Sequence, residues 1–189
     1  KPHCILCNQE SKKLSNEEIK ETILETVADA LKSAQGKKVF GVNISDAKLK
    51  LYAPVVVGRK GEYYQLLYDL LGKGYSKVRI DGEMHNLRDR IELPKQKKHD
   101  IDVLVDTLYF SEFRDDEKAA RERLAEASER AMNETEGLVR VVFNFNTASS
   151  KTQAQEKDGE VGANEFLMSS KFACPNDGFS YPEIEPRLF

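Results

Sequence analysis

The apolar residues of this chain fall into short runs that alternate between two spacings, and this alternation constrains the fold more than any other feature. Apolar residues at every fourth position are typical of a helix that buries one face, and apolar residues at every second position are typical of a half-buried strand. No run approaches the roughly 20 apolar residues that a membrane helix needs. The succession predicts an α/β (α+β) fold in which a small mixed sheet is covered by helices.

Three helices are predicted. The first begins after Ser15, whose hydroxyl can accept from a free N–H of the first turn, and ends at Gly36. Its four-residue repeat is Ile19, Ile23, Val27 and Leu31. The second covers residues 62–71, with an apolar stripe at Leu66, Leu67, Leu70 and Leu71, and is ended by Gly72 and Gly74. The third covers residues 115–134 and has a narrow face of Ala120, Leu124, Ala127 and Ala131.

Five strands are predicted, at residues 38–42, 49–57, 75–80, 101–105 and 138–145. Pro54 lacks a backbone donor, so its strand is expected to lie at an edge or to bend there. In the third strand Val78 and Ile80 share one face, and Lys77 and Arg79 share the other. Residues 43–46 and 81–82 are expected to form turns, and residues 86–99 a polar, basic loop.

The chain of 189 residues is long enough for one core with a small appended module. We divide it into an N-terminal arm (1–13), a folded domain (14–146), a mobile linker (147–165) and a C-terminal arm (166–189). The linker is rich in Ser, Lys, Gln, Glu and Gly and has almost no large apolar residue.

Three cysteines cannot form a fully paired disulfide framework, which favours a reducing compartment, the cytoplasm. Cys4 and Cys7 have the Cys-x-x-Cys spacing of a zinc knuckle. Cys174 opens a second knuckle-like turn in which Asp177 stands where a second cysteine would complete the site. The three thiols either hold a zinc ion, with Asp177 as a further possible ligand, or remain reduced in an unfinished site.

No arrangement in the sequence indicates catalysis. There is no Gly-x-Ser-x-Gly elbow and no His-Glu-x-x-His helix, and residues 115–117 suit the negative first turn of a helix. Gly58 and Gly61 precede a predicted helix, which is a general recipe for phosphate binding. The spacing does not match a P-loop, however. The alternative is a turn that exposes Arg59 and Lys60 to a protein partner.

A local basic surface is the strongest candidate for binding. Lys77 and Arg79 could combine with a set of basic residues in the following loop, namely Arg88, Arg90, Lys95, Lys97, Lys98 and His99. Such charges are often merely solvated, but they also suit an acidic protein surface or the phosphates of DNA. The net charge of −3 argues against nucleic-acid binding through the overall field of the chain. Few aromatics lie among these charges, so stacking on single-stranded bases has little support.

Four blocks in the chain resemble, in order, the partner-docking insertion of the UvrA family of bacterial nucleotide-excision-repair proteins. The blocks are APVVVGRKGE at 53–62, GYSKVRIDGE at 74–83, LPK and KKHDIDVLVD between 93 and 106, and a tail containing FACP, GFS and EPRLF between 172 and 189. Together with Pro2-His3-Cys4, they touch most of the chain.

The resemblance implies that the whole protein is an ABC-type ATPase that dimerises, scans DNA and loads UvrB at lesions. This chain has no Walker A lysine loop, no Leu-Ser-Gly-Gly signature and no Walker B strand, so ATP is expected to bind elsewhere in the whole protein. The residues expected to contact UvrB are Arg59, Lys60, Lys77, Arg79, Lys97 and Lys98, with Lys77 and Arg79 foremost. An alternative function is DNA binding by the basic loop at 88–99.

The resemblance also marks three departures. The family often has arginine where this chain has Lys77 and Thr107, and lysine lacks the bidentate fork of arginine. Docking is therefore expected to be weaker or rearranged in this protein. The third departure is Asp177, because the family usually has cysteine there, which bears on the predicted zinc site.

Overall fold

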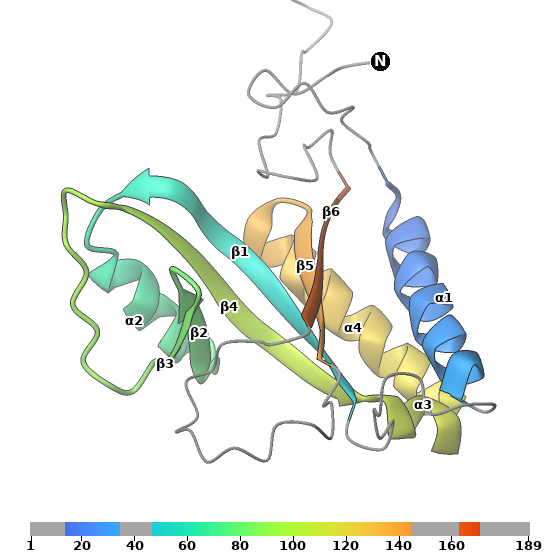
Figure 1. The fold of residues 1–189 in the computed structure, drawn as a ribbon. Coiled ribbons are helices and arrows are strands. Elements are labelled where there is room, and N and C mark those ends of the chain that lie inside the picture. Colours follow the sequence, from blue (N-terminus) through green and yellow to red (C-terminus); the bar gives the residue numbers. More distant parts are fainter. Residues whose placement is uncertain (1–13, 35–46, 145–162, 171–189) are drawn as a thin grey trace, which may run out of the picture.

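The computed structural model describes residues 14–34, 47–144 and 163–170 (Figure 1). They form an α+β fold, as predicted. The helices are α1 (Asn16–Ala34), α2 (Tyr64–Gly72), α3 (Phe110–Asp115) and α4 (Glu117–Thr135). The strands are β1 (Lys48–Lys60), β2 (Lys77–Ile80), β3 (Glu83–Asn86), β4 (Lys98–Tyr109), β5 (Leu138–Asn144) and β6 (Ala163–Ser169).

The six strands form one sheet in the order β3-β2-β4-β1-β5-β6. We expected a mixed sheet, but each pairing between these strands is antiparallel. The reason for the error is that the spacing of apolar residues identifies a strand without giving the direction of its neighbour. The ladder between β1 and β4 is the longest of these pairings, and it runs from Lys48 opposite Tyr109 to Lys60 opposite Lys98.

The helices pack on one face of the sheet (Figure 1). Helix α4 lies against β1, β4 and β5 and buries the predicted narrow face. Helix α1 packs against α3 and α4 and buries Ile19, Ile23 and Val27. Its start has the predicted cap, because the Glu18 N–H donates to Ser15 Oγ at 3.1 Å and the Ser15 N–H donates back to Glu18 Oε2 at 2.6 Å.

The predicted bend at Pro54 is present. Strand β1 pairs with β5 only as far as Tyr52, so Pro54 lies where β1 is paired with β4 alone. The register between β1 and β4 shifts between Pro54 and Val56. Strand β1 can therefore tolerate the missing N–H although it lies inside the sheet.

Several elements differ from the prediction. Strand β4 has 12 residues, more than the five that alternate, because its polar ends pair along the whole of β1. The short elements β3 and α3 were not predicted. The predicted strand at 38–42, the turn at 43–46 and the helix end at Gly36 lie outside the described residues.

Strand β6 changes the predicted division of the chain. It pairs with β5 along its whole length, from Ala163 opposite Asn144 to Ser169 opposite Leu138. The sheet therefore includes residues that we assigned to the linker (163–165) and to the C-terminal arm (166–169). None of the described helices is long and apolar enough to span a membrane.

Candidate functional site

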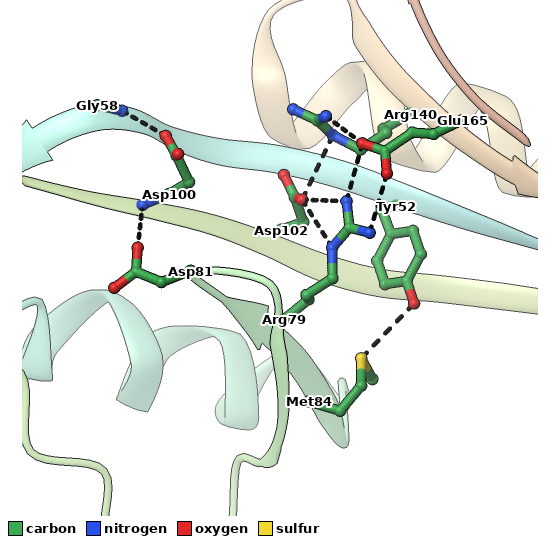
Figure 2. A network of polar contacts seen from close by, with 9 residues as sticks. All are labelled: Tyr52, Gly58, Arg79, Asp81, Met84, Asp100, Asp102, Arg140 and Glu165. Atoms are coloured by element: carbon green, nitrogen blue, oxygen red, sulfur yellow. Dashed lines mark hydrogen bonds and ion pairs between the residues drawn. The ribbon is translucent and has the colours of Figure 1, made fainter. Parts of the chain in front are cut away.

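Two groups of polar side chains make up the candidate site. One lies on a face of the sheet, and the other lies where β1 ends and β4 begins. The first lies on the face of the sheet opposite the helices, and we call it the sheet-face network. It consists of Arg79, Asp102, Arg140 and Glu165 (Figure 2). Arg79 is on this face because its neighbours Val78 and Ile80 turn into the hydrophobic core. The predicted division of strand β2 into an apolar and a polar face is thus confirmed.

Ion pairs in the sheet-face network connect four strands. Arg79 on β2 donates from Nη2 to Asp102 Oδ2 on β4 at 2.8 Å, and to Glu165 Oε1 on β6 at 3.1 Å. Arg140 on β5 approaches the same two carboxylates, with Nε 3.3 Å from Asp102 Oδ2 and Nη1 bonded to Glu165. The Arg79 guanidinium also lies 4.7 Å from the centre of the Tyr52 ring, which includes β1 in the group.

Burial explains the electrostatics of the network. Arg79 and Asp102 are only 8% and 4% exposed. Burial raises the pKa of Asp102 in spite of the two arginines. Burial lowers the pKa of Arg79, but the hydrogen bonds to Glu165 and Asp102 raise it by more. The pKa of this arginine is therefore raised. Arg79, which was predicted to contact a partner, therefore forms its ion pairs within the sheet.

Asp102, Arg140 and Glu165 were the residues of the network that sequence analysis missed. A signal for Asp102 was present, because a carboxylate on the polar side of an otherwise apolar strand needs a positive partner on a neighbouring strand. No comparable signal existed for Glu165, which lies 86 residues from Arg79 in sequence. Among the described residues Asp102 Oδ1 is buried without a hydrogen-bond partner, so the network satisfies only one of the two Asp102 oxygens.

The second group, which we call the basic end, consists of Arg59, Lys60, Lys97 and Lys98. The antiparallel ladder brings them together, because Arg59 lies opposite His99 and Lys60 opposite Lys98. All four are exposed, and within the described part of the chain none forms an ion pair. Lys77 is also exposed, but Val78 beside it pairs with Val103, five residues along β4 from Lys98. Lys77 is thus level with Leu104, six residues and about 20 Å from Lys98 along the strand.

A chain of hydrogen bonds holds in place the main chain next to the residues of the basic end. The Gly58 N–H donates to Asp100 Oδ1 at 2.6 Å, and the Asp100 N–H donates to Asp81 Oδ1 at 2.8 Å (Figure 2). Gly58 has a φ of 59°, so its N–H is directed at a carboxylate and not left for a phosphate. The bonds connect the end of β1, the β2–β3 turn and the start of β4.

His99 completes this support. Its Nδ1 lies 2.7 Å from Asp81 Oδ2 and its Nε2 lies 3.0 Å from the carbonyl oxygen of Pro94. The hydrogen bond with Asp81 and the one with Pro94 raise the pKa of His99, whose side chain is 2% exposed. His99 therefore holds the basic loop against the β2–β3 turn and is not itself presented to a partner.

The predicted zinc ligands Cys4, Cys7, Cys174 and Asp177 lie outside the described residues, so zinc binding stays a prediction. Within residues 14–34, 47–144 and 163–170, no group of three or more His, Cys, Asp or Glu side chains is arranged to hold a metal ion.

A family model described as the UvrA interaction domain matches residues 37–144, which include the basic end and every residue of the sheet-face network except Glu165. The chain belongs to the UvrA interaction domain family. Proteins similar to it include UvrABC system protein A of Bradyrhizobium diazoefficiens, 44% identical over 75% of this chain, and that of Deinococcus radiodurans, 35% identical over 100% of this chain. The matches cover 14% and 15% of these relatives, so the chain spans about one seventh of their length.

The register of this UvrA interaction domain also places Lys77 and Thr107, the two positions at which the resemblance led us to expect arginine. Thr107 on β4 lies directly opposite Lys50 on β1. Lys50 stands between Leu49 and Leu51, which both face the helices. Thr107 therefore lies on the face that carries the sheet-face network, and so does Lys77, because Val78 faces the core. The two positions, far apart in sequence, share one face of the sheet.

Proposed function

We propose that this UvrA interaction domain docks UvrB, and that it carries the docking function of a longer protein of nucleotide excision repair. That longer protein would be a dimeric, DNA-binding ABC-type ATPase. The domain itself would supply no catalytic residue, because ATP would be bound elsewhere in the protein.

The proposal rests on the exposure of the predicted contact residues and on their lack of ion pairs with the described residues. Five of the six, namely Arg59, Lys60, Lys77, Lys97 and Lys98, are exposed and form no ion pair with the described residues. Most other arginines of the domain, such as Arg123 and Arg140, are paired with carboxylates. Unpaired positive charge is what an acidic partner can use for steering and for register.

Two surfaces could then meet the partner. The basic end offers four cations close together, and the sheet face offers Lys77 with Thr107 in place of two arginines. A lysine can bind a carboxylate only as a point charge, and threonine has no charge. We therefore assign the larger share of the docking energy in this protein to the basic end.

Charge reversal tests the proposal and separates the two surfaces. The variants are Arg59→Glu with Lys60→Glu at the basic end, Lys77→Glu on the sheet face, and Lys118→Glu on α4 as a matched exposed control. We expect the first to weaken binding of purified UvrB roughly ten-fold or more in calorimetry, the second to weaken it less, and the control to bind normally. Unchanged binding by both test variants would refute the proposal.

Arg79 is not a suitable position for this test. A glutamate at 79 would face Asp102 and Glu165 across the distances that now hold ion pairs, so a loss of binding would follow from loss of folding.

A separate test addresses the alternative function, DNA binding by the loop at 88–99. Arg88, Lys95, Lys97 and Lys98 are exposed there, but Arg90 is paired with Glu92 at 2.6 Å and Asp89 adds negative charge. Affinity for duplex DNA that falls steeply with added salt would support the alternative, and no binding at low salt would remove it.

A further inference from the structure

Helix α2 presents two tyrosines to solvent one turn apart. Tyr64 is 52% exposed and Tyr68 is 73% exposed. Among the described residues the other exposed large hydrophobic side chains are Tyr109 and Phe166, which lie on different elements. Two such rings on one helix face are unusual for a surface without a partner, because tyrosine is enriched where proteins bind each other.

A groove of about 500 Å³ lies beside Tyr68. Its apolar lining comes from Val55 of β1 and from Leu66 and Leu70 of α2. On its rim, the Lys73 ammonium forms an ion pair of 2.7 Å with Glu134 at the end of α4. Asp69 adds a further carboxylate to the lining. The groove is therefore apolar along Val55, Leu66 and Leu70 and polar at Asp69, Lys73 and Glu134, and it has room for one or two apolar side chains.

The start of α2 is held in a strained conformation. Tyr63, which precedes the helix, has a φ of 54°, a left-handed conformation that bulky residues avoid, and its side chain provides no helix cap. Its hydroxyl donates to the Lys60 carbonyl oxygen at 3.1 Å, and its ring lies against Gly61, whose φ is 154°. Strain that persists in a structure is frequent at binding surfaces, where it fixes the geometry before the ligand arrives.

We propose that the tyrosine groove, formed by Tyr68 and the apolar lining described above, with Tyr64 exposed one turn before it on α2, takes an apolar side chain from an acidic segment of the docking partner. The inference rests on the proposed function and adds an anchor to it. Tyr64 follows the free cations Arg59 and Lys60 by only four to five residues, and the Tyr63 hydroxyl bond keeps this turn closed. Aromatic rings next to arginine form the usual composition of an interface hot spot.

A second copy of this chain fits the groove less well. In a symmetric pair the same patch meets itself, so the groove contact would bring Arg59 and Lys60 toward their own copies. Like charges facing each other in an interface oppose association. An acidic segment satisfies both the groove and the neighbouring cations.

The test compares Tyr68→Ala with Tyr109→Ala, which removes an exposed tyrosine from the far end of β4. In the full chain, we expect Tyr68→Ala to raise the Kd for purified UvrB roughly ten-fold or more, and Tyr109→Ala to change it less than about two-fold. Tyr68→Phe should restore most of the affinity, because it keeps the ring. Circular dichroism and thermal unfolding verify that each variant is folded.

Different results separate this inference from the proposed function. If Arg59→Glu with Lys60→Glu weakens binding while Tyr68→Ala does not, the groove proposal is wrong and basic-end docking stands. If neither change affects binding, both are wrong. A dimer of the chain that dissociates on Tyr68→Ala in sedimentation velocity would assign the groove to a second copy and overturn the proposed occupant.

Discussion

The two ring nitrogens of His99 both face hydrogen-bond acceptors, namely the Asp81 carboxylate and the carbonyl oxygen of Pro94. A neutral imidazole has one donor, so only the protonated ring can donate to both. The charged groups around it are Asp81 on the β2–β3 turn, Arg59 opposite it on β1, and Lys97, Lys98 and Asp100 beside it in sequence. A cationic His99 thus stabilises the surface that we assign to docking.

The stability of the domain should therefore depend on pH through this pair. The folded pKa of His99 is raised above its usual 6.5, so its contribution is complete below that value and is lost as pH rises through the folded pKa. Asp81 has a pKa below its usual 3.8, because hydrogen bonds from Asp100 and His99 outweigh burial, which raises it. Its contribution is lost only as pH falls through that lowered value. The pair is thus fully stabilising between 3.8 and 6.5.

His99→Gln measures this dependence. The difference in free energy of unfolding between the native chain and the variant, from urea titrations, should be largest between pH 4 and 6.5 and should shrink above the folded pKa of His99. An NMR titration midpoint for His99 at or below 6.5 would contradict the assignment.

At the scale of elements, the cap of α4 gives a second prediction. Asp116 Oδ1 accepts from the Ala119 N–H at 3.1 Å, whereas its neighbour Asp115 pairs only with exposed Arg114. We expect Asp116→Ala to lower the free energy of unfolding by about 1 kcal/mol, and Asp115→Ala to lower it by clearly less. Urea unfolding of the two variants provides the measurement. Equal losses would mean that charge near the helix end, and not the cap, stabilises α4.

The same helix shows what sequence could reveal about elements. Its buried residues repeat at helical spacing, and its acidic start was recognised, so α4 was predicted within two residues at its start and one at its end. Helix α3 was missed because six residues give too little periodicity to recognise. Strand β3 was missed because its four residues alternate weakly, although the turn at Asp81 and Gly82 predicts a hairpin at that place.

At the scale of the whole molecule, the sheet-face network joins strands that the sequence keeps far apart. The two arginines and two carboxylates balance in charge and connect β2, β4, β5 and β6 through side chains as well as through the ladder. Apolar spacing could predict that Arg79 faces away from the core. The spacing could not predict which strands lie near Arg79, because the position of β6 depends on the order of the strands in the sheet, and apolar spacing does not give that order.

Because both arginines share both carboxylates, the effects of removing Asp102 and Glu165 should not add. In Asp102→Asn or Glu165→Gln alone, each arginine keeps one carboxylate. In the double variant two guanidinium groups remain together near the protein interior without either of these two counter-charges, which is strongly unfavourable. We expect the double variant to lose about 1–3 kcal/mol more than the sum of the single losses in urea unfolding at pH 7.

Asp102→Asn combined with Asp115→Asn, at the end of α3 and outside the sheet-face network, is the control and should be additive within about 0.5 kcal/mol. Additivity of the Asp102 and Glu165 changes to the same precision would show that the four residues act as separate pairs. Strand β6 would then be held by its ladder with β5 alone. A larger combined loss would instead show that β6 and β2, at opposite sides of the sheet, are stabilised as one unit through the arginines between them.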